Sequence, residues 1–366
     1  MKIKQLKVKK LQNRIDCDLK FNDDLNIVTG QNGSGKTTVL KLIWYLISGN
    51  IERVFRELVF EYLKLKTSNY DLEIKVESET ILYKWKLKGK DQNIFEYKRK
   101  TERKLEHEDI NIDFINMDLV KASEGSVFFP TFRRIEGGFT LTDADENYRY
   151  KRRPSNQIEE GLMRLSSQLS VFDNFFISSI STNDILELLR RKHSESSEEV
   201  NQLHIGMSTF IEKKIQSSQD KTTSKSKDAI LDDIKKKVLS ISTEREKLLS
   251  PFTTLASLIS EIYQHKGILL TDKFSVGNTE EAISSAKLSA GEKQLLSFIC
   301  YNAFSKESPF IIDEPELSLH VDWQRNLVPI LMSQRTNNQI IIATHSPFIY
   351  SKYPEKELLL NDYRGE

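Results

Sequence analysis

Apolar and polar positions alternate weakly over residues 1–29, a pattern typical of half-exposed strands. Leu25, Ile27 and Val28 end this region with a short apolar strand, and residues 39–47 continue with apolar positions at helical spacing. Gly49 and Asn50 are expected to stop that helix. Residues 51–67 carry a second helical pattern. The chain is therefore predicted to begin with strands, followed by two helices.

Residues 72–76 and 81–88 show a stricter alternation of apolar and charged side chains. This pattern predicts an antiparallel sheet with one face in water, because successive side chains of a strand point to opposite faces. Lys84, Lys86 and Lys88 are expected on the wet face.

The C-terminal part combines unbroken apolar runs with helical segments. Residues 308–315 and 339–346 read as buried strands, and the segment between them reads as a helix. Such an arrangement predicts a parallel sheet covered on both faces. A further helix is expected to begin within 287–294 and to run to about Phe304. Ser289 and Glu292 have the spacing of a capping box at its start.

The middle of the chain, residues 155–264, is mostly helical in pattern. A polar run at 216–227 interrupts it and is expected to form a mobile loop. Two arms of about 30 residues would each reach about 45 Å, and no sustained heptad register appears. The predicted organisation is an N-terminal lobe at 1–154, an α-helical insertion at 155–264 and a C-terminal lobe at 265–366.

Composition narrows the class of protein only a little. The 54 Lys and Arg residues nearly balance the 53 Asp and Glu residues, so net charge argues neither for nor against nucleic acid. Cys17 and Cys300 are far apart and form no metal-site spacing, which suits a reducing compartment. Neither a signal peptide nor a run of about 20 apolar residues is found, so we expect a cytoplasmic protein without a membrane span.

The sequence GQNGSGKT at residues 30–37 lies between the first apolar strand and its helix. It has the spacing of a phosphate-binding P-loop, in which glycines let backbone N–H groups turn toward anionic oxygens and the following helix adds its positive end. The alternative, a turn without ligand, is disfavoured by the flanking strand and helix. The residues expected to contact ATP here are Gly30, Asn32, Gly33, Ser34, Gly35, Lys36, Thr37 and Thr38.

Two carboxylates end the apolar strand at 308–313. Strand ends are where parallel sheets meet ligands, so Asp313 is expected to hold Mg²⁺ together with the Thr37 hydroxyl. Glu314 is expected to polarise a water toward the γ-phosphate, while Lys36 reaches the β- and γ-phosphates. An Asp–Glu pair before proline is also a common strand exit, but the P-loop upstream favours the catalytic interpretation.

Four motifs in order resemble an ABC-type ATPase: GQNGSGKT at 30–37, LSAGE at 288–292, FIIDEP at 310–315 and THS at 344–346. The chain is most similar to the RecF/SMC-like branch, which includes the OLD nucleases and the ATPase subunits of anti-phage systems such as Septu and PARIS. The resemblance covers roughly 1–140 and 270–366. It implies an α/β fold: an ATPase head with a mixed or parallel sheet core and an antiparallel β subdomain.

The resemblance also implies roles for further residues. In the signature LSAGE, Ser289, Gly291 and Glu292 are expected to contact the γ-phosphate bound by an opposite protomer, so that ATP joins two heads. Ala290 replaces the usual second glycine. Residues 316–320 resemble the D-loop and His345 the switch histidine. Asn13 and Arg14 match a polar–basic pair near the nucleotide. No Q-loop glutamine is assigned, although the loop at 129–134 is a candidate for that region.

Several charged segments leave two interpretations open. Arg133 and Arg134 suit loop salt bridges or phosphate sensing. Asp143, Asp145 and Glu146 suit a solvated acidic loop or a metal site. The basic runs at 148–153 and 84–104 suit a solvated surface or nucleic-acid contacts.

The function predicted from these motifs is an ATPase that uses ATP and Mg²⁺ and forms a homodimer or higher homo-oligomer through ATP. Since the sequence holds no second catalytic constellation, we expect a sensor or scaffold that controls a separate effector, a nuclease or toxin, in prokaryotic anti-phage defence. The alternatives are a RecF/SMC-like repair ATPase that binds DNA and the ATPase head of an OLD-like nuclease.

Overall fold

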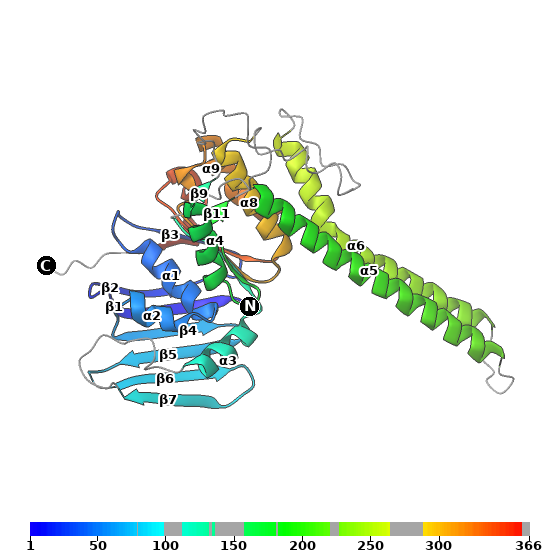
Figure 1. The fold of residues 1–366 in the computed structure, drawn as a ribbon, viewed down its shortest axis with the longest axis horizontal. Coiled ribbons are helices and arrows are strands. Elements are labelled where there is room, and N and C mark those ends of the chain that lie inside the picture. Colours follow the sequence, from blue (N-terminus) through cyan, green and yellow to red (C-terminus); the bar gives the residue numbers. More distant parts are fainter. Residues whose placement is uncertain are drawn as a thin grey trace, which may run out of the picture. The chain divides into compact units, whose positions relative to one another are not determined.

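The computed structural model of the chain describes residues 1–78, 80–98, 112–131, 134–135, 157–180, 182–219, 227–263 and 288–360. Its contacts divide the chain into two compact units. The first combines Met1–Ser181 with Ser289–Glu366, and the second is Thr182–Leu288. Figure 1 shows the elements of both units along the chain.

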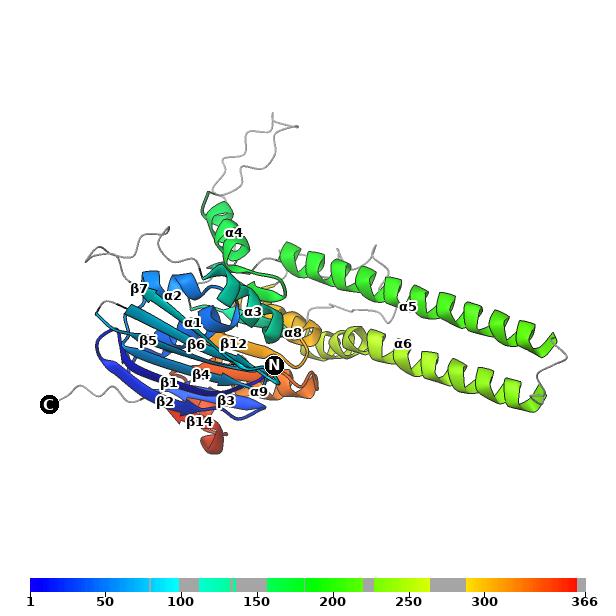
Figure 2. The same cartoon turned by 90° about the horizontal axis from the view of Figure 1, so that it is seen from below.

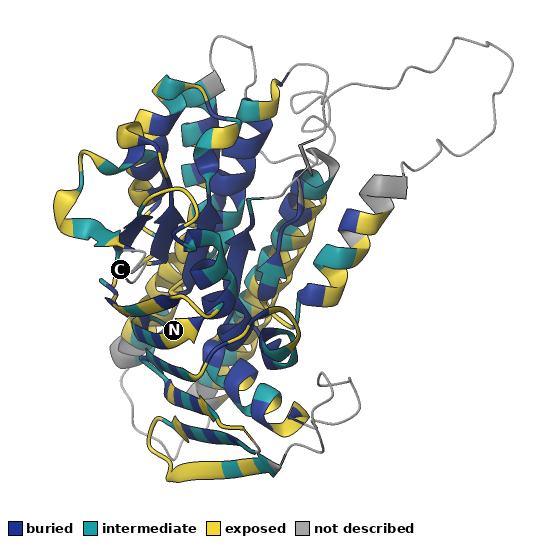
Figure 3. Ribbon diagram, turned by 90° about the vertical axis from the view of Figure 1, so that its left-hand side faces the viewer, coloured by how far each residue is buried: buried dark blue, intermediate teal, exposed yellow. Residues whose placement is uncertain are grey.

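The first unit contains a six-stranded sheet in which every neighbouring pair is parallel, as the apolar runs predicted. Its strands β3, β8, β12 and β13 are buried at every position (Figure 3), because both faces of the sheet are covered. In spatial order the strands are β10 (Asn174–Phe176), β8 (Ser126–Phe129), β12 (Pro309–Asp313), β13 (Gln339–Ala343), β3 (Leu25–Thr29) and β14 (Glu357–Leu359).

Helices pack around this sheet. Helix α1 contacts β8, β12 and β13, and its Trp44 packs against Phe128 and Phe176 with ring centroids 5.8 and 5.1 Å away. Helix α8 contacts α9 and the small sheet formed by β9 and β11. The bounds are α1 (Lys36–Ile47), α4 (Gln157–Leu169), α8 (Ala290–Phe304), η2 (Pro315–Leu317), α9 (Val321–Ser333), α10 (Pro347–Tyr350), η3 (Pro354–Lys356), β9 (Arg134–Ile135) and β11 (Ser179–Ile180).

A second, antiparallel sheet completes the first unit and confirms the predicted alternation. Its wet face carries lysines that meet carboxylates across the strands: Lys64 Nζ lies 3.5 Å from Glu73 Oε2, and Lys7 Nζ lies 3.6 Å from Asp18 Oδ2. In spatial order the strands are β2 (Ile15–Lys20), β1 (Ile3–Leu11), β4 (Tyr62–Thr67), β5 (Tyr70–Val76), β6 (Thr80–Leu87) and β7 (Gln92–Lys98); α2 (Ile51–Glu57) and α3 (Asp113–Ser123) accompany them.

The helix predicted over 51–67 is wrong in its second half. Helix α2 ends at Glu57, and Tyr62–Thr67 forms β4, which pairs with β1 and β5. Leu63, Leu65 and Thr67 are buried at every second position. The period of two along this strand therefore outweighs the helical pattern that precedes it.

The second unit consists of two long helices, α5 (Thr182–Gln219) and α6 (Lys227–Tyr263), which lie side by side (Figures 1 and 2). They have 38 and 37 residues, which corresponds to about 55 Å each and exceeds the predicted arms. Helix α5 also includes the first residues of the polar run at 216–227; residues 220–226 lie outside the described chain.

The second unit begins at Thr182, whereas the helical insertion was predicted from the sequence to begin at residue 155. Helix α4 and strands β10 and β11 belong to the first unit, because β10 pairs with β8 and β11 with β9. Across the described residues, no helix combines the length and the apolar run that a membrane span requires.

Candidate nucleotide-binding site

Four neighbouring parallel strands end at one edge of the buried sheet, and each leads into a predicted site segment. Strand β3 pairs with β13, β13 with β12, and β12 with β8, all in parallel register. Because parallel strands end on the same side, the P-loop, His345, Glu314 and Thr131 follow four adjacent strand ends. The fold thus gathers residues from four separate parts of the sequence.

The P-loop follows β3 directly, and Ile15 packs closely against it at Gly35. Gly35 has a φ of 91°, and a Cβ atom there would lie 2.2 Å from Ile15 Cδ1. Gly33 has a φ of 81° with no atom within 4 Å of its ideal Cβ position. The loop is therefore supported on one side and open on the other. Asn13 and Arg14, predicted to lie near the nucleotide, are exposed in the turn that leads into Ile15.

Lys36 is 4% exposed and folds back over the loop. Its Nζ donates hydrogen bonds to the carbonyls of Gly30, at 3.0 Å, and Gln31, at 3.2 Å. Burial lowers the pKa of Lys36, while the carboxylates of Glu314, Asp313 and Glu316 act against that fall. The ammonium group therefore lies within the loop, where a phosphate oxygen could replace the two carbonyl partners.

Asp313 lies at the end of β12 with no exposed surface. Its Oδ2 accepts a hydrogen bond from Thr131 Oγ1, and Thr131 Oγ1 lies 3.4 Å from Thr37 Oγ1. The predicted metal residues Thr37 and Asp313 are thus brought to one place, with Thr131 between them. Hydroxyl and carboxylate oxygens are the hard donors that Mg²⁺ prefers, so this set fits the ion.

Glu314 has a left-handed backbone, with a φ of 47°, which is uncommon for a residue other than glycine. Its amide donates to the carbonyl of Ala343 at 2.9 Å, which fixes the turn against β13. Burial raises the pKa of Glu314, and repulsion from Asp313 and Glu316 adds to the rise. The carboxyl therefore takes up a proton more readily than an exposed glutamate.

His345 lies between the predicted base and the P-loop lysine. Its Nε2 is 3.7 Å from Glu314 Oε1, and its Nδ1 is 3.5 Å from Lys36 Nζ. The backbone amide of His345 donates to Glu316 Oε1 at 2.6 Å. Glu316 therefore helps to position the histidine, a role that the sequence analysis did not assign to it.

The signature residues lie at the start of α8. Ser289 caps the helix, and its side chain and that of Glu292 form the predicted capping box, with Ser289 N donating to Glu292 Oε2 at 2.7 Å. A Cβ on Gly291 would lie 2.4 Å from the Ser318 carbonyl, so the helix start packs tightly against the predicted D-loop. Ser289 and Ala290 are exposed.

Helix α8 is also linked to the turn after Glu314. Gln294 is fully buried, and its Nε2 donates to the Pro315 carbonyl at 2.9 Å. Helix α8 and the turn after Glu314 are therefore connected by a buried hydrogen bond.

Some predicted residues fall elsewhere. Arg134 lies in β9, whereas Arg133, Asp143, Asp145, Glu146 and residues 148–153 lie outside the described chain. Within the described ranges, no group of three or more His, Cys, Asp or Glu side chains is arranged to hold a metal ion.

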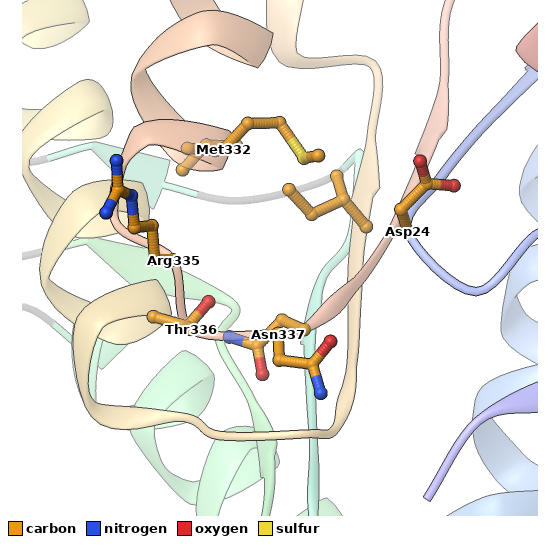
Figure 4. Close-up of a pocket in the computed structure, with 8 residues that line it drawn as sticks. Asp24, Met332, Arg335, Thr336 and Asn337 are labelled. Carbon is orange, nitrogen blue, oxygen red and sulfur yellow. The ribbon is translucent and has the colours of Figure 1, made fainter.

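A pocket opens at the opposite edge of the sheet (Figure 4). Asp24 and Asn338 line it and directly precede β3 and β13, and Met332, Arg335 and Thr336 complete much of the wall. Asp24 is paired with Lys356 Nζ at 2.8 Å. The pocket contains none of the predicted site residues.

Comparisons with known proteins support the resemblance. A family model described as "AAA ATPase domain" matches residues 1–350. The DNA replication and repair protein RecF of Desulfitobacterium hafniense (strain DSM 10664 / DCB-2) is 44% identical over 57 residues, which span 16% of this chain and 16% of that protein.

Two retron proteins are also similar. The Retron Vc95 probable ATPase of Vibrio cholerae serotype O1 biovar El Tor is 25% identical over 94% of this chain and 71% of its own length. The Retron Ec83 probable ATPase of Escherichia coli is 34% identical over 22% of this chain and 16% of its own length.

Among solved structures, the Smc head domain with an extended coiled coil, bound to the C-terminal domain of ScpA and derived from Pyrococcus furiosus, is 14% identical. The alignment covers 96% of this chain and 91% of that one, with a TM-score of 0.39.

Proposed function

Since the chain belongs to the AAA ATPase domain family, we propose that it binds and hydrolyses ATP at the edge where β3, β8, β12 and β13 end. The observation that carries the proposal is the meeting of Lys36, His345 and Glu314 beside the buried Asp313. A P-loop, a buried cation, oxygen donors for Mg²⁺ and a carboxylate suited to act as a base are thereby combined at one place.

Each group has a defined task in this proposal. Backbone N–H groups of the loop donate to the phosphates, and Lys36 Nζ exchanges the Gly30 and Gln31 carbonyls for phosphate oxygens. Thr37 and Asp313 would hold Mg²⁺, which would neutralise charge on the phosphates. Glu314 accepts the proton of the attacking water, and its raised pKa brings it closer to the working pH of a base.

His345 fixes the positions of Glu314 and Lys36 relative to each other, because its Nε2 faces Glu314 and its Nδ1 faces Lys36. Its orientation is supported by Glu316 on the backbone side. The task assigned to His345 is therefore to hold the base while the γ-phosphate lies on the Lys36 side.

We further infer that the site is completed by a second copy of the chain. The support is the exposed Ser289 on a capped helix whose start is fixed against the Ser318 carbonyl. In this arrangement Ser289, Gly291 and Glu292 serve the γ-phosphate of the opposite protomer. ATP then favours a homodimer or a higher homo-oligomer.

The biological role we propose is a nucleotide-gated sensor or scaffold that controls a separate effector, a nuclease or toxin, in prokaryotic anti-phage defence. Support comes from the similarity to retron probable ATPases and from a helical unit that contains none of the predicted site residues. Its long helices expose apolar side chains, including Ile205, Leu231 and Leu239, on which a partner could pack.

The DNA-binding alternative has one supporting observation, the local similarity to RecF. The lysines on the wet face of the antiparallel sheet support it less, since Lys64 and Lys7 are balanced by carboxylates within ion-pair distance. Binding to DNA through such a face should fall steeply with added salt, because lysine–phosphate contacts release counterions.

The proposal is tested by Glu314→Gln. We expect the variant to bind ATP with Mg²⁺, to hydrolyse it about 100-fold more slowly or worse, and to accumulate as an ATP-bound dimer, because the amide cannot accept the water's proton. Phosphate release and light scattering measure the two effects. In the same preparations the wild-type chain should cut neither DNA nor RNA in Mg²⁺ or Mn²⁺.

The matched control is Glu96→Gln, which changes an exposed glutamate of β7 in the same way. Unchanged turnover in Glu314→Gln would assign the base to another residue. Metal-dependent nucleic-acid cleavage by the chain alone, lost when residues outside the ATP site are mutated, would overturn the proposal of a separate effector.

A further inference from the structure

Thr131 lies beyond the end of β8, the one strand of the site edge that leads to no predicted catalytic residue. It follows β8 after Pro130, and β8 pairs with β12 in a register that puts Phe129 opposite Ile312. Pro130 is thus level with Asp313, the last residue of β12, and Thr131 follows one residue beyond it. The sequence separates Thr131 and Asp313 by 182 positions.

The hydroxyl of Thr131 lies between the two side chains expected to hold Mg²⁺. It donates to Asp313 Oδ2 and is 3.4 Å from Thr37 Oγ1. The Thr131 hydroxyl is therefore within hydrogen-bond distance of both predicted ligands.

The strand end that carries Thr131 is held firmly. Phe129 is fully buried, with its ring edge-on to Phe298 at 4.8 Å and to Tyr301 at 5.6 Å between centroids. Pro130 follows, and its ring fixes its own φ angle. The hydroxyl is thus presented by a rigid element, as a group that orients metal ligands requires.

We propose that Thr131 is a positioning residue of the Mg²⁺ site. A hydroxyl has one donor and two acceptor positions, so Thr131 can hold Asp313 with its proton and still accept a hydrogen bond from a metal-bound water. Asp313 and Thr37 are thereby kept oriented when the nucleotide arrives with its metal. The inference rests on the proposed ATP site and assigns to β8 a part in it.

A purely structural role gives a different expectation. If Thr131 only satisfied a buried carboxylate, its removal would weaken the fold, and extra metal would not restore nucleotide binding. If it orients the metal ligands, its removal would weaken metal binding in particular, and a higher metal concentration would compensate.

The test compares Thr131→Val, Thr131→Ser and the control Thr243→Val, in which the lost hydroxyl is exposed on α6 and donates only along its own helix to Leu239, at 3.0 Å. Binding of Mn²⁺ is followed by electron paramagnetic resonance at a fixed concentration of a non-hydrolysable ATP analogue. Binding of a fluorescent form of the same ATP analogue is measured in parallel at low and at saturating Mn²⁺.

We expect Thr131→Val to need about 10- to 100-fold more Mn²⁺ and to bind the analogue like the wild type once Mn²⁺ is saturating. Thr131→Ser should restore most of the Mn²⁺ affinity, and Thr243→Val should not change it. Wild-type Mn²⁺ affinity in Thr131→Val, or loss of analogue binding that saturating Mn²⁺ does not restore, would overturn the inference.

The outcome also separates this inference from the proposed function. A wild-type chain that binds no nucleotide with Mn²⁺ would reject the ATP site itself. If the wild-type chain binds the ATP analogue and Mn²⁺, and Thr131→Val binds the two equally well, only the role of Thr131 would be rejected.

Discussion

The strand-edge cluster and the start of α8 differ in where their side chains find partners. At the strand edge, His345 contacts both Lys36 and Glu314, and Asp313 is fully buried. At the start of α8, the backbone is fixed by the Ser289–Glu292 cap and by the Ser318 carbonyl, while Ser289 itself is exposed. The side chains of the strand edge therefore have their partners within the chain, whereas the start of α8 presents an exposed serine on a fixed backbone.

This difference separates two kinds of measurement. A phosphate-binding group such as Lys36, whose partners lie within one chain, should act on nucleotide affinity in the isolated protomer. A group that is exposed on a fixed helix start should act on association and turnover, and leave affinity in the protomer unchanged. The buried Gln294–Pro315 hydrogen bond, at 2.9 Å, connects the two regions and gives a path by which association could influence the Glu314 turn.

The largest effect is expected at Lys36. Lys36→Ala removes the buried ammonium from the loop, so ATP affinity should fall by about 100-fold or more, since a charge-assisted contact in a buried site is worth several kcal/mol. Isothermal titration with ATP and Mg²⁺ measures the affinity. Lys41→Ala, a partly buried lysine further along the same helix, serves as the control and should bind normally.

A Lys36→Ala chain that binds ATP as tightly as the wild type would contradict the assignment of the P-loop. It would also remove the basis for calling the strand edge a complete phosphate site.

The second prediction concerns the exposed region. Ser289→Arg should leave ATP affinity of the protomer within about 2-fold while abolishing ATP-dependent association and most hydrolysis, because a bulky cation replaces a small hydroxyl at a surface that must approach a second copy. Sedimentation with and without ATP measures association. Ser333→Arg, at the exposed end of α9, is the control.

Mixing Ser289→Arg with Lys36→Ala sharpens the comparison further. If each site combines the loop of one chain with the signature of another, one of the two sites in the mixed dimer is intact and should recover part of the activity. Loss of ATP affinity in Ser289→Arg alone would show that the signature acts within its own chain.

Local patterns predicted most of the strand edge. The P-loop, the buried strands around Asp313 and His345, and the Ser289–Glu292 cap each depend on residues close in sequence, so spacing alone indicated them. Strand β4 was misread because its alternation follows a helix without a clear break.

Thr131 and Glu316 could not be predicted in the same way. Threonines and glutamates are common, and these two acquire their roles through partners that are distant in the chain: Asp313 lies 182 positions from Thr131, and His345 lies 29 positions from Glu316. Only the register of β8 beside β12, and of β12 beside β13, brings them together.

The smallest predicted effect tests how strongly burial and the neighbouring carboxylates disfavour the ionised form of Glu314 at the strand edge. The pKa of Glu314 is raised in the folded chain by burial, Asp313 and Glu316, so the folded state holds this proton more tightly than the unfolded state. The resulting stabilisation is present below the usual glutamate pKa and is lost as pH rises through the raised value. Above the raised value the carboxylate therefore costs stability, and at pH 7.5 nucleotide-free Glu314→Gln should melt about 1–3 °C higher than the wild type. At pH 4, below the usual glutamate pKa, the difference should shrink toward zero. Calorimetry at the two pH values measures the melting temperatures, with Glu96→Gln as the control whose melting temperature should change at neither pH.

A difference in melting temperature that is equal at both pH values would mean that packing, and not charge, distinguishes glutamine from glutamate at position 314. The repulsion among the carboxylates of the strand edge would then be weaker than their contacts indicate.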